Sequence, residues 1–250
     1  VRHDPIIVRS NELVPWERDE SPSYLAGMDS ARLHGQDYAM LIAQITDIHL
    51  GFDPGNPGEA NRLRLNRVIA ALNALSPRPD VLLVTGDIAD RGTAKAYAQF
   101  REAMSAIACP VYCCPGNHDR RENFRAALPQ PDALPGFIQY GFDMGELRVL
   151  VLDTLEEGRH GGAFCAFRAA WLRAELAKAP NTPTVIAMHH PPAATGIGWL
   201  DCDPGEPWIA RLAHVLAGRP QLIKGNRQIL FRGMGRLTES SIVNTKNKYR

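Results

Sequence analysis

The sequence lacks the features that mark a membrane, secreted or nucleic-acid-binding protein. No apolar run approaches the roughly 18 residues that a membrane-spanning helix needs. The N-terminus has no basic stretch followed by an apolar core, so we expect no secretory signal. The net charge is only +1 over 250 residues, which gives the chain as a whole no electrostatic attraction to nucleic acid. We therefore expect a cytoplasmic protein with no membrane or nucleic-acid partner; the sequence does not indicate an oligomeric state.

Cysteine is also scarce, and no internal repeat or low-complexity tract is present. None of the five cysteines forms a Cys-x-x-Cys pair, which excludes the common zinc and redox motifs. We expect all five to be free thiols in a reducing compartment. The remaining composition, 45% hydrophobic and 22% charged, is that of an ordinary globular protein, and the length suits one sizeable domain.

The residue pattern divides the chain into three segments. Residues 1–39 carry scattered prolines without periodicity, so we expect an irregular N-terminal extension. From Met40, a candidate start, to residue 223, short apolar runs alternate with helical periodicity, as in a layered α/β domain. Residues 224–250 form an atypical basic tail. The domain's expected strands are 41–46, 81–85, 111–114, 137–144, 147–153 and 184–188, and its helices lie around 65–72, 94–107, 167–179 and 208–217.

Side chains that can bind metals follow four of these strands. They are Asp47 and His49 after the first, Asp87 after the second, Asn117, His118 and Asp119 after the third, and His189 and His190 after a later one. Each short motif alone is weak, since Asp-x-His or Gly-Asp after a strand often does no more than cap a loop. In open α/β sheets, however, ligand sites are built at the carboxyl ends of strands. The four motifs together therefore predict one site at that edge.

The residue types suit two divalent ions such as Mn, Fe or Zn, because carboxylate, amide oxygen and imidazole are ligands that these metals share. Asp47 and His49 are two apart, so in extended chain both side chains would point the same way. Asp87 is the candidate to bridge two ions about 3.5–4 Å apart, the spacing of two-metal hydrolases. Asn117 would add a neutral oxygen ligand and His189 an imidazole. Such a pair lowers the pKa of a bridging water and orients a phosphate.

These motifs resemble those of calcineurin-like metallophosphoesterases. The matching segments are Asp47-x-His49, Gly86-Asp87, Gly116-Asn117-His118-Asp119 and His189-x-Pro191. More narrowly, residues 40–222 look like the bacterial class III cyclic-nucleotide phosphodiesterases and related glycerophosphodiesterases. Segments 158–162, 171–172, 189–192 and 195–197 also carry that likeness. The resemblance implies a four-layer α/β fold with two packed mixed β-sheets flanked by helices, the second sheet being incomplete here.

The resemblance also implies roles for individual residues. One ion would be held by Asp47, His49 and Asp87, and the other by Asp87, Asn117 and His189. His118 would contact phosphate or protonate the leaving oxygen. Asp90 is placed like the acid that pairs with this histidine in phosphoprotein phosphatases, where it would fix the ring and raise its pKa. Arg91 is either a phosphate contact or an exposed loop arginine, and His190 supports the site rather than binding an ion.

The chain departs from the family pattern near its end. The family carries a Gly-His-x-His motif with one histidine for each ion, whereas this chain has Lys224-Gly225-Asn226-Arg227-Gln228 there and no histidine after His214. Lysine or arginine occurs at seven tail positions, 224, 227, 232, 236, 246, 248 and 250, against one acid, Glu239. The tail is a frameshifted or truncated end, a basic segment that contacts phosphate, or a solvated extension.

Three functions remain open on these grounds. The first is a metal-dependent phosphodiesterase that hydrolyses a small phosphodiester, such as a 3',5'-cyclic nucleotide, by attack of a metal-bridging hydroxide on phosphorus. The second is a catalytically impaired remnant of such an enzyme, since each ion lacks one histidine. The third is a phosphomonoesterase, phosphoprotein phosphatase or DNA nuclease of the same superfamily.

Overall fold

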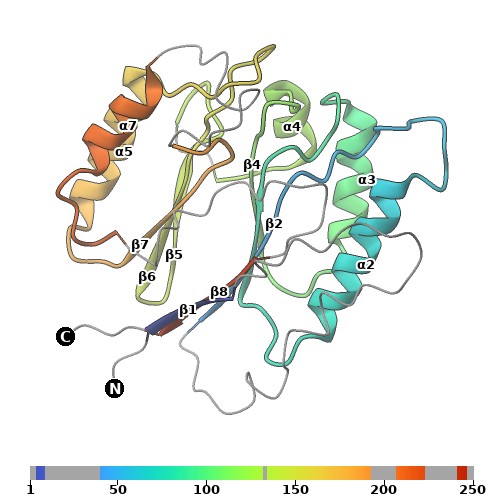
Figure 1. Ribbon diagram of the computed structural model, residues 1–250, viewed down its shortest axis with the longest axis horizontal. Coiled ribbons are helices and arrows are strands. Elements are labelled where there is room, and N and C mark those ends of the chain that lie inside the picture. The colour runs from blue at the N-terminus through green and yellow to red at the C-terminus, as the bar shows by residue number, and fades with distance from the viewer. Residues whose placement is uncertain (1–3, 9–39, 132–133, 193–206, 223–240, 247–250) are drawn as a thin grey trace, which may run out of the picture.

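A computed structural model of the chain describes residues 4–8, 40–131, 134–192, 207–222 and 241–246 (Figure 1). Its strands are β1 (Asp4–Val8), β2 (Leu41–Ile45), β3 (Val81–Thr85), β4 (Val111–Cys114), β5 (Tyr140–Met144), β6 (Leu147–Val151), β7 (Thr184–Ala187) and β8 (Ser241–Lys246). Its helices are α2 (Ala60–Ala74), α3 (Ala94–Met104), α4 (Arg121–Ala127), α5 (Ala166–Lys178) and α7 (Trp208–Leu216). No helix in these ranges is both long and apolar enough to cross a membrane.

The strands form two sheets. The first has the order β1-β8-β2-β3-β4, with β2, β3 and β4 parallel and β8 antiparallel to both β1 and β2. The second has the order β5-β6-β7, in which β5 and β6 form an antiparallel hairpin and β7 runs parallel to β6. Helices α2 and α3 cover the outer face of the first sheet, and α5 and α7 cover the outer face of the second (Figure 1). The expected four-layer fold with two mixed sheets is confirmed.

Alternation along β6 explains why the second sheet lies between two layers. Val149 and Val151 are buried in the core shared with the first sheet, whereas Leu150 and Leu152 are buried against α5 and α7. Because successive side chains of a strand point to opposite faces, a strand covered on both faces reads as a continuous apolar run. The run from Val149 to Leu152 has this pattern.

Two local features have their causes in the sequence. The Thr93 side chain accepts a hydrogen bond from the Ala96 N–H at 3.3 Å and caps α3. The hairpin turns at Gly145 and Glu146, where Gly145 has φ +59°, a left-handed conformation that glycine adopts without strain.

The two ends of the chain differ from expectation where the structure describes them. Residues 4–8 form β1 rather than irregular chain, and residues 241–246 of the expected tail form β8, which pairs with β2. Both segments contain β-branched residues, which favour strands, yet each is too short for its period to stand out in the sequence. At the other end of the domain, Leu222 forms an isolated bridge with Thr184 beside β7. The motif at 195–197 and residues 224–240 lie outside the described ranges.

Candidate metal centre

The loops that leave β2 and β3 stay hydrogen-bonded beyond the ends of the strands. The Asp47 N–H donates to the Gly86 carbonyl at 3.1 Å, and the His49 N–H donates to the Asp87 carbonyl at 2.8 Å. The parallel pairing of the two strands thus continues into the loops. It brings the Asp-x-His and Gly-Asp motifs side by side at the carboxyl edge of the sheet.

Three side chains of this edge sit on left-handed backbone. Asp47, His49 and Asp87 have φ of +55°, +51° and +51°. Each such non-glycine conformation costs on the order of 1–3 kcal/mol and persists only where the surroundings enforce it. The expectation that Asp47 and His49 lie in extended chain is wrong, because the segment turns in order to keep its backbone bonded to the neighbouring loop.

Glycine at two positions makes room for the cluster. A Cβ atom at Gly86, where φ is +97°, would lie 2.4 Å from Nδ1 of His189. A Cβ atom at Gly116 would lie 2.2 Å from Oδ1 of Asp87. The glycines of the Gly-Asp and Gly-Asn-His-Asp motifs therefore allow close approach of a ligand side chain rather than a turn alone.

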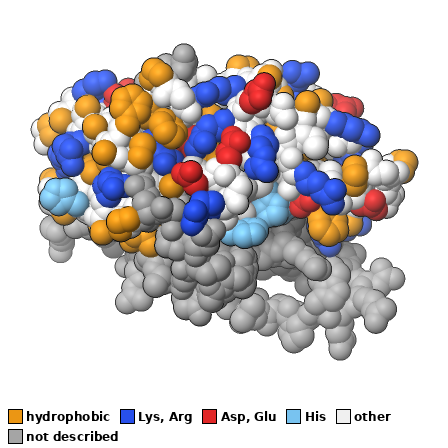
Figure 2. All heavy atoms as spheres, turned by 90° about the horizontal axis from the view of Figure 1, so that it is seen from above, with side chains coloured by type: hydrophobic (Ala, Val, Ile, Leu, Met, Phe, Trp, Pro, Cys, Tyr) orange, Lys and Arg blue, Asp and Glu red, His pale blue; other side chains and the backbone are white. Residues whose placement is uncertain are grey.

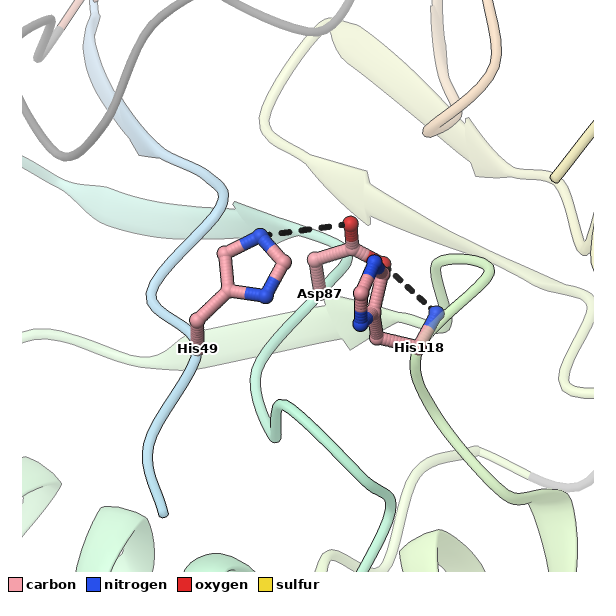
Figure 3. Close-up of side chains that lie close together, drawn as sticks. All are labelled: His49, Asp87 and His118. Atoms are coloured by element: carbon pink, nitrogen blue, oxygen red, sulfur yellow. Dashed lines mark hydrogen bonds and ion pairs between the residues drawn. The ribbon is translucent and has the colours of Figure 1, made fainter. Parts of the chain in front are cut away.

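The structure brings the predicted ligands together around one carboxylate. Ligand atoms of Asp47, Asp87 and His189 all lie within 4.8 Å of one another, and the same holds for His49, Asp87 and His118. Figure 3 shows His49 and His118 on opposite sides of the Asp87 carboxylate. Four loops that are far apart in the sequence thus converge; three follow β2, β3 and β4 of the first sheet, and the fourth follows β7 of the second.

Asp87 has the position that a bridging ligand requires. It is fully buried, and its Oδ2 atom lies 3.5 Å from Nε2 of His49 and 3.5 Å from Nε2 of His189. Two ligand atoms that each lie about 2.1 Å from one ion are about 3.0–3.5 Å apart, so both distances suit a shared ion. Oδ2 has no hydrogen-bond partner among the described residues, although its other oxygen accepts the N–H of His118 at 3.0 Å. A buried carboxylate oxygen without a donor is costly unless a cation satisfies it.

His189 is oriented for metal binding by the strand beside it. Its Nδ1 lies 2.8 Å from the Thr85 carbonyl, which can only accept, so Nδ1 carries the hydrogen. In the neutral ring Nε2 is then an acceptor, and it faces Oδ1 of Asn117 at 3.1 Å and the Asp87 carboxylate. An acceptor that faces two oxygens needs a proton or a cation between them. The donor set therefore fits a divalent ion at this point.

The charges of the cluster reinforce one another. Burial alone would lower the pKa of His49, but the carboxylates of Asp47, Asp87 and Asp90 raise it above 6.5. Burial alone would raise the pKa of Asp87, but the imidazoles of His189, His49 and His118 hold it far below its ordinary value. The site thus favours a carboxylate anion next to groups of positive charge, which is the environment that a cation also provides.

Asp90 contacts two of the histidines. Its Oδ1 lies 3.3 Å from Nδ1 of His49 and 3.8 Å from Nδ1 of His118, while its backbone carbonyl accepts from Nδ1 of His118 at 2.8 Å. The Asp90 carboxylate, which was expected to pair with His118, therefore contacts both histidines and lies closer to His49. Arg91 is 70% exposed, with Nε 3.6 Å from the Asp90 carboxylate.

His190 connects the site to the loop that follows β6. Its Nδ1 lies 2.8 Å from Oγ1 of Thr154, its Nε2 lies 3.1 Å from the carbonyl of His160, and its ring packs edge-on against His189. These contacts agree with a supporting role. The His160 ring is exposed, and its centre lies 6.3 Å from that of His118.

Sequence reasoning missed several residues that hold this edge. The Asn61 amide donates to the His49 carbonyl at 2.9 Å, and the Asp119 carboxylate accepts from Tyr97 at 2.9 Å. Tyr97 falls within the expected helix 94–107, and nothing local in the sequence shows where its hydroxyl points. On the face of the molecule above the sheets, histidine side chains reach the surface with lysine and arginine side chains around them (Figure 2).

The chain is similar to several known proteins. A family description for calcineurin-like phosphoesterases matches residues 40–212. A glycerophosphodiester phosphodiesterase of Enterobacter lignolyticus is 32% identical, over 74% of this chain and 68% of its own. A 3',5'-cyclic-nucleotide phosphodiesterase of Nostoc is 33% identical, over 64% of this chain and 60% of its own. A purple acid phosphatase from yellow lupin shares the fold, with a TM-score of 0.54 and 17% identity over 73% of this chain and 36% of that one.

Proposed function

The chain belongs to the calcineurin-like phosphoesterase family, and from that premise we propose that it is a metal-dependent phosphodiesterase acting on a small phosphodiester such as a 3',5'-cyclic nucleotide. The family hydrolyses phosphate esters with divalent metals. Relatives about 30% identical carry the names of glycerophosphodiester and cyclic-nucleotide phosphodiesterases, which supports a small diester as substrate.

One observation carries the proposal. In the part of the chain that the structure describes, no group donates a hydrogen bond to the buried Asp87 Oδ2, yet it lies 3.5 Å from the Nε2 atoms of both His49 and His189. A purely structural carboxylate would be surrounded by donors, as buried polar groups in native proteins are. An oxygen without a donor between two imidazoles is instead what a bridging metal ligand requires.

The proposed ligand sets follow from the geometry. Asp47, His49 and Asp87 would hold one divalent ion, and Asp87, Asn117 and His189 the other. When bound, the two ions would lower the pKa of a water to near neutrality and offset the charge that develops on the phosphate. The protein's own contribution is to fix these oxygens and nitrogens before substrate arrives.

His118 is proposed as the general acid. Its Nδ1 faces the Asp90 carbonyl, which can only accept, so Nδ1 carries a hydrogen and Nε2 is the atom that can move a proton. The side chain is 33% exposed and can therefore reach a substrate. We place the Nε2–H of His118 toward the leaving alcohol oxygen of the diester.

An impaired remnant is the competing proposal, and one observation favours it. No histidine follows His214, so each ion would have three protein ligands instead of the family's larger set. Since even losses outside the ligand set reduce metal affinity 10–100-fold, weak or incomplete metal binding would follow. The number of ions per chain after purification in Mn²⁺ separates the two: two ions support the enzyme, and one or none supports the remnant.

The phosphodiesterase is tested by turnover of bis-p-nitrophenyl phosphate with added Mn²⁺. Asp87→Ala is expected to lower turnover by at least about 100-fold, beyond what losses outside the ligand set cause. Asp143→Ala is the matched control, since that carboxylate is 71% exposed on β5, and it is expected to retain parental activity. Circular dichroism confirms that both variants fold.

The substrate class is tested in the same preparation. Cyclic AMP and a glycerophosphodiester are compared with a phosphopeptide and single-stranded DNA. Preference for the small diesters supports the proposal. No turnover of any diester by parental protein that has bound Mn²⁺ would overturn it, and preference for the phosphopeptide would replace it with a phosphatase.

A further inference from the structure

Asp119 is a fully buried carboxylate that the proposed chemistry does not use. It ends the Gly-Asn-His-Asp motif, yet it belongs to neither group of candidate ligand atoms in the described part of the chain. Four donors surround its two oxygens. They are the N–H groups of Gly116 at 2.8 Å, Ala89 at 3.1 Å and Ile88 at 3.3 Å, and the hydroxyl of Tyr97 at 2.9 Å.

These donors come from three different segments. The N–H of Gly116 lies directly before Asn117, in the loop that follows β4. The N–H groups of Ile88 and Ala89 come directly after Asp87, in the loop that follows β3. A single carboxylate thus fixes the backbone immediately beside two proposed metal ligands, and hydrogen bonds to a charged acceptor are the strong ones.

Tyr97 connects this carboxylate to a helix. Its ring is fully buried on α3, its hydroxyl donates to Asp119, and it accepts the N–H of Arg120 at 3.0 Å. The hydroxyl therefore both donates and accepts a hydrogen bond. Because Thr93 caps the start of the same helix, the position of the hydroxyl is set by a rigid element rather than by a loop.

The two loops that Asp119 joins need to be held together. Asp87 has φ +51°, and the N–H of His118 on the opposite loop donates to its Oδ1 at 3.0 Å. A Cβ atom at Gly116 would overlap that oxygen. The loops are thus as close as their backbones permit, with a strained residue at the contact, and such strain persists only when neighbouring contacts over-determine it.

We propose that Asp119, supported by Tyr97, is the positioning residue that sets the distance between Asp87 and Asn117 and so determines how tightly the second ion binds. This inference rests on the proposed metal site. Asp119 binds no ion and touches no substrate. It acts through the backbone N–H groups on either side of the two ligands.

The test measures Mn²⁺ affinity by calorimetry rather than activity. Asp119→Asn keeps the shape, but its amide nitrogen cannot accept two of the four hydrogen bonds, and we expect affinity to fall about 10–100-fold, as for other residues that orient ligands. Tyr97→Phe keeps the buried ring and loses only the hydroxyl; we expect a smaller decrease in the same direction. The absorption spectrum of bound Co²⁺, which reports ligand geometry, should change in both variants.

Asp153→Asn is the matched control. Asp153 is also fully buried and accepts from Arg121 at 2.7 and 2.8 Å, from the Ile138 N–H at 2.8 Å and from the Leu155 N–H at 3.0 Å, but it lies at the end of β6. We expect it to lower the unfolding temperature while Mn²⁺ affinity stays within about threefold of the parent, since its bonds do not join the ligand loops.

The outcomes separate the two proposals. Failure of the parental protein to bind Mn²⁺ overturns the metal site itself. Parental binding together with an Asp119→Asn affinity equal to that of Asp153→Asn overturns only the positioning role. If Asp119→Asn does not fold, Tyr97→Phe decides: unchanged affinity and an unchanged Co²⁺ spectrum overturn the inference.

Discussion

Nδ1 of His49 lies 3.3 Å from the Oδ1 carboxylate oxygen of Asp90, a shorter distance than the 3.8 Å that separates the same oxygen from His118. A carboxylate next to the ring nitrogen that does not bind the ion fixes the tautomer and makes the other nitrogen a better ligand. In this arrangement Nε2 of His49 points toward Asp87 (Figure 3). Asp90 therefore faces a proposed metal ligand as well as the proposed acid, although Nδ1 of His49 makes no hydrogen bond with the described residues.

The contact between Asp90 and His49 predicts which properties the Asp90→Asn variant loses. Mn²⁺ affinity should fall about 10–100-fold, because the amide no longer provides a charged partner for His49. Loss of turnover should be similar for a p-nitrophenyl ester and for an alkyl ester. His118→Gln should instead impair the alkyl ester more, since a poor leaving group needs a proton.

Arg91→Gln is the control for this pair, because it removes only the exposed guanidinium beside Asp90. It should leave Mn²⁺ affinity within about twofold, as expected for an exposed ion pair. If Asp90→Asn has parental metal affinity and impairs only the alkyl ester, Asp90 acts through His118 alone.

The second prediction concerns pH. Without metal, the raised pKa of His49 stabilises the fold fully below 6.5, and this contribution is lost as the pH rises through the folded-state value. The lowered pKa of Asp87 acts in the opposite sense, since its contribution is present above 3.8 and is lost as the pH falls toward the folded value. Urea unfolding in EDTA should therefore show the paired charges contributing most between about pH 4 and 6.5.

The affinity for Mn²⁺ should rise with pH over the range in which the contribution of His49 to stability is lost. Mn²⁺ competes with the proton on His49, so its affinity should rise about tenfold per pH unit until that proton is lost. Calorimetric titrations between pH 5.5 and 8 measure the slope. A flat profile would show that His49 is not a ligand.

The third prediction concerns the close approach at Gly86. Gly86→Ala places a Cβ atom 2.4 Å from Nδ1 of His189 on backbone with φ +97°, so the imidazole has to move. We expect Mn²⁺ affinity to fall at least tenfold and the free energy of unfolding to fall by more than about 1 kcal/mol.

Gly145→Ala provides the comparison, because Gly145 also has positive φ but a Cβ atom there meets nothing within 4 Å. That variant should lose about 1 kcal/mol of stability and retain its metal affinity. Equal metal affinity in the two variants would show that the contact at Gly86 has no bearing on the site.

The fourth prediction concerns thiol reactivity. Burial alone would raise the pKa of Cys165, but the backbone and side chain of Arg168 lower it below 9.0, whereas burial raises the pKa of Cys113 and Cys114. Since the thiolate is the reactive form, iodoacetamide should modify Cys165 at least about tenfold faster than either buried thiol. Peptide mass spectrometry over time measures this, with Cys165→Ser as the control that removes the fast product.

The sequence predicts strands β2 to β7 and helices α2, α3, α5 and α7 because their signals are local, but it does not predict α4. Apolar runs, the Thr93 cap and the Gly145 turn each depend on neighbours in the chain. The meeting of Asp47 and Asp87 also follows from strand order, since the parallel strands β2 and β3 end at one edge. His189 follows β7 of the second sheet, so its approach to them depends on how the two sheets pack.

What sequence reasoning missed depends on contacts between distant residues. Tyr97 reads as an apolar helix position, and only the folded chain brings its hydroxyl to Asp119, 22 residues away. The left-handed turns at Asp47 and His49 arise from pairing with the loop after β3, and the identity of either residue does not reveal them. The strands at 4–8 and 241–246 depend on each other and on β2 in the same way.

The hydrogen bond between Nδ1 of His189 and the Thr85 carbonyl has a kinetic consequence. Because that carbonyl belongs to a buried strand, the folded chain holds the ring in one orientation without an ion. Uptake of a cation on this side then requires shedding of its hydration water but no search among rotamers. Association at the half of the centre beside β3 should accordingly proceed at a rate set by the water exchange of the metal rather than by motions of the polypeptide.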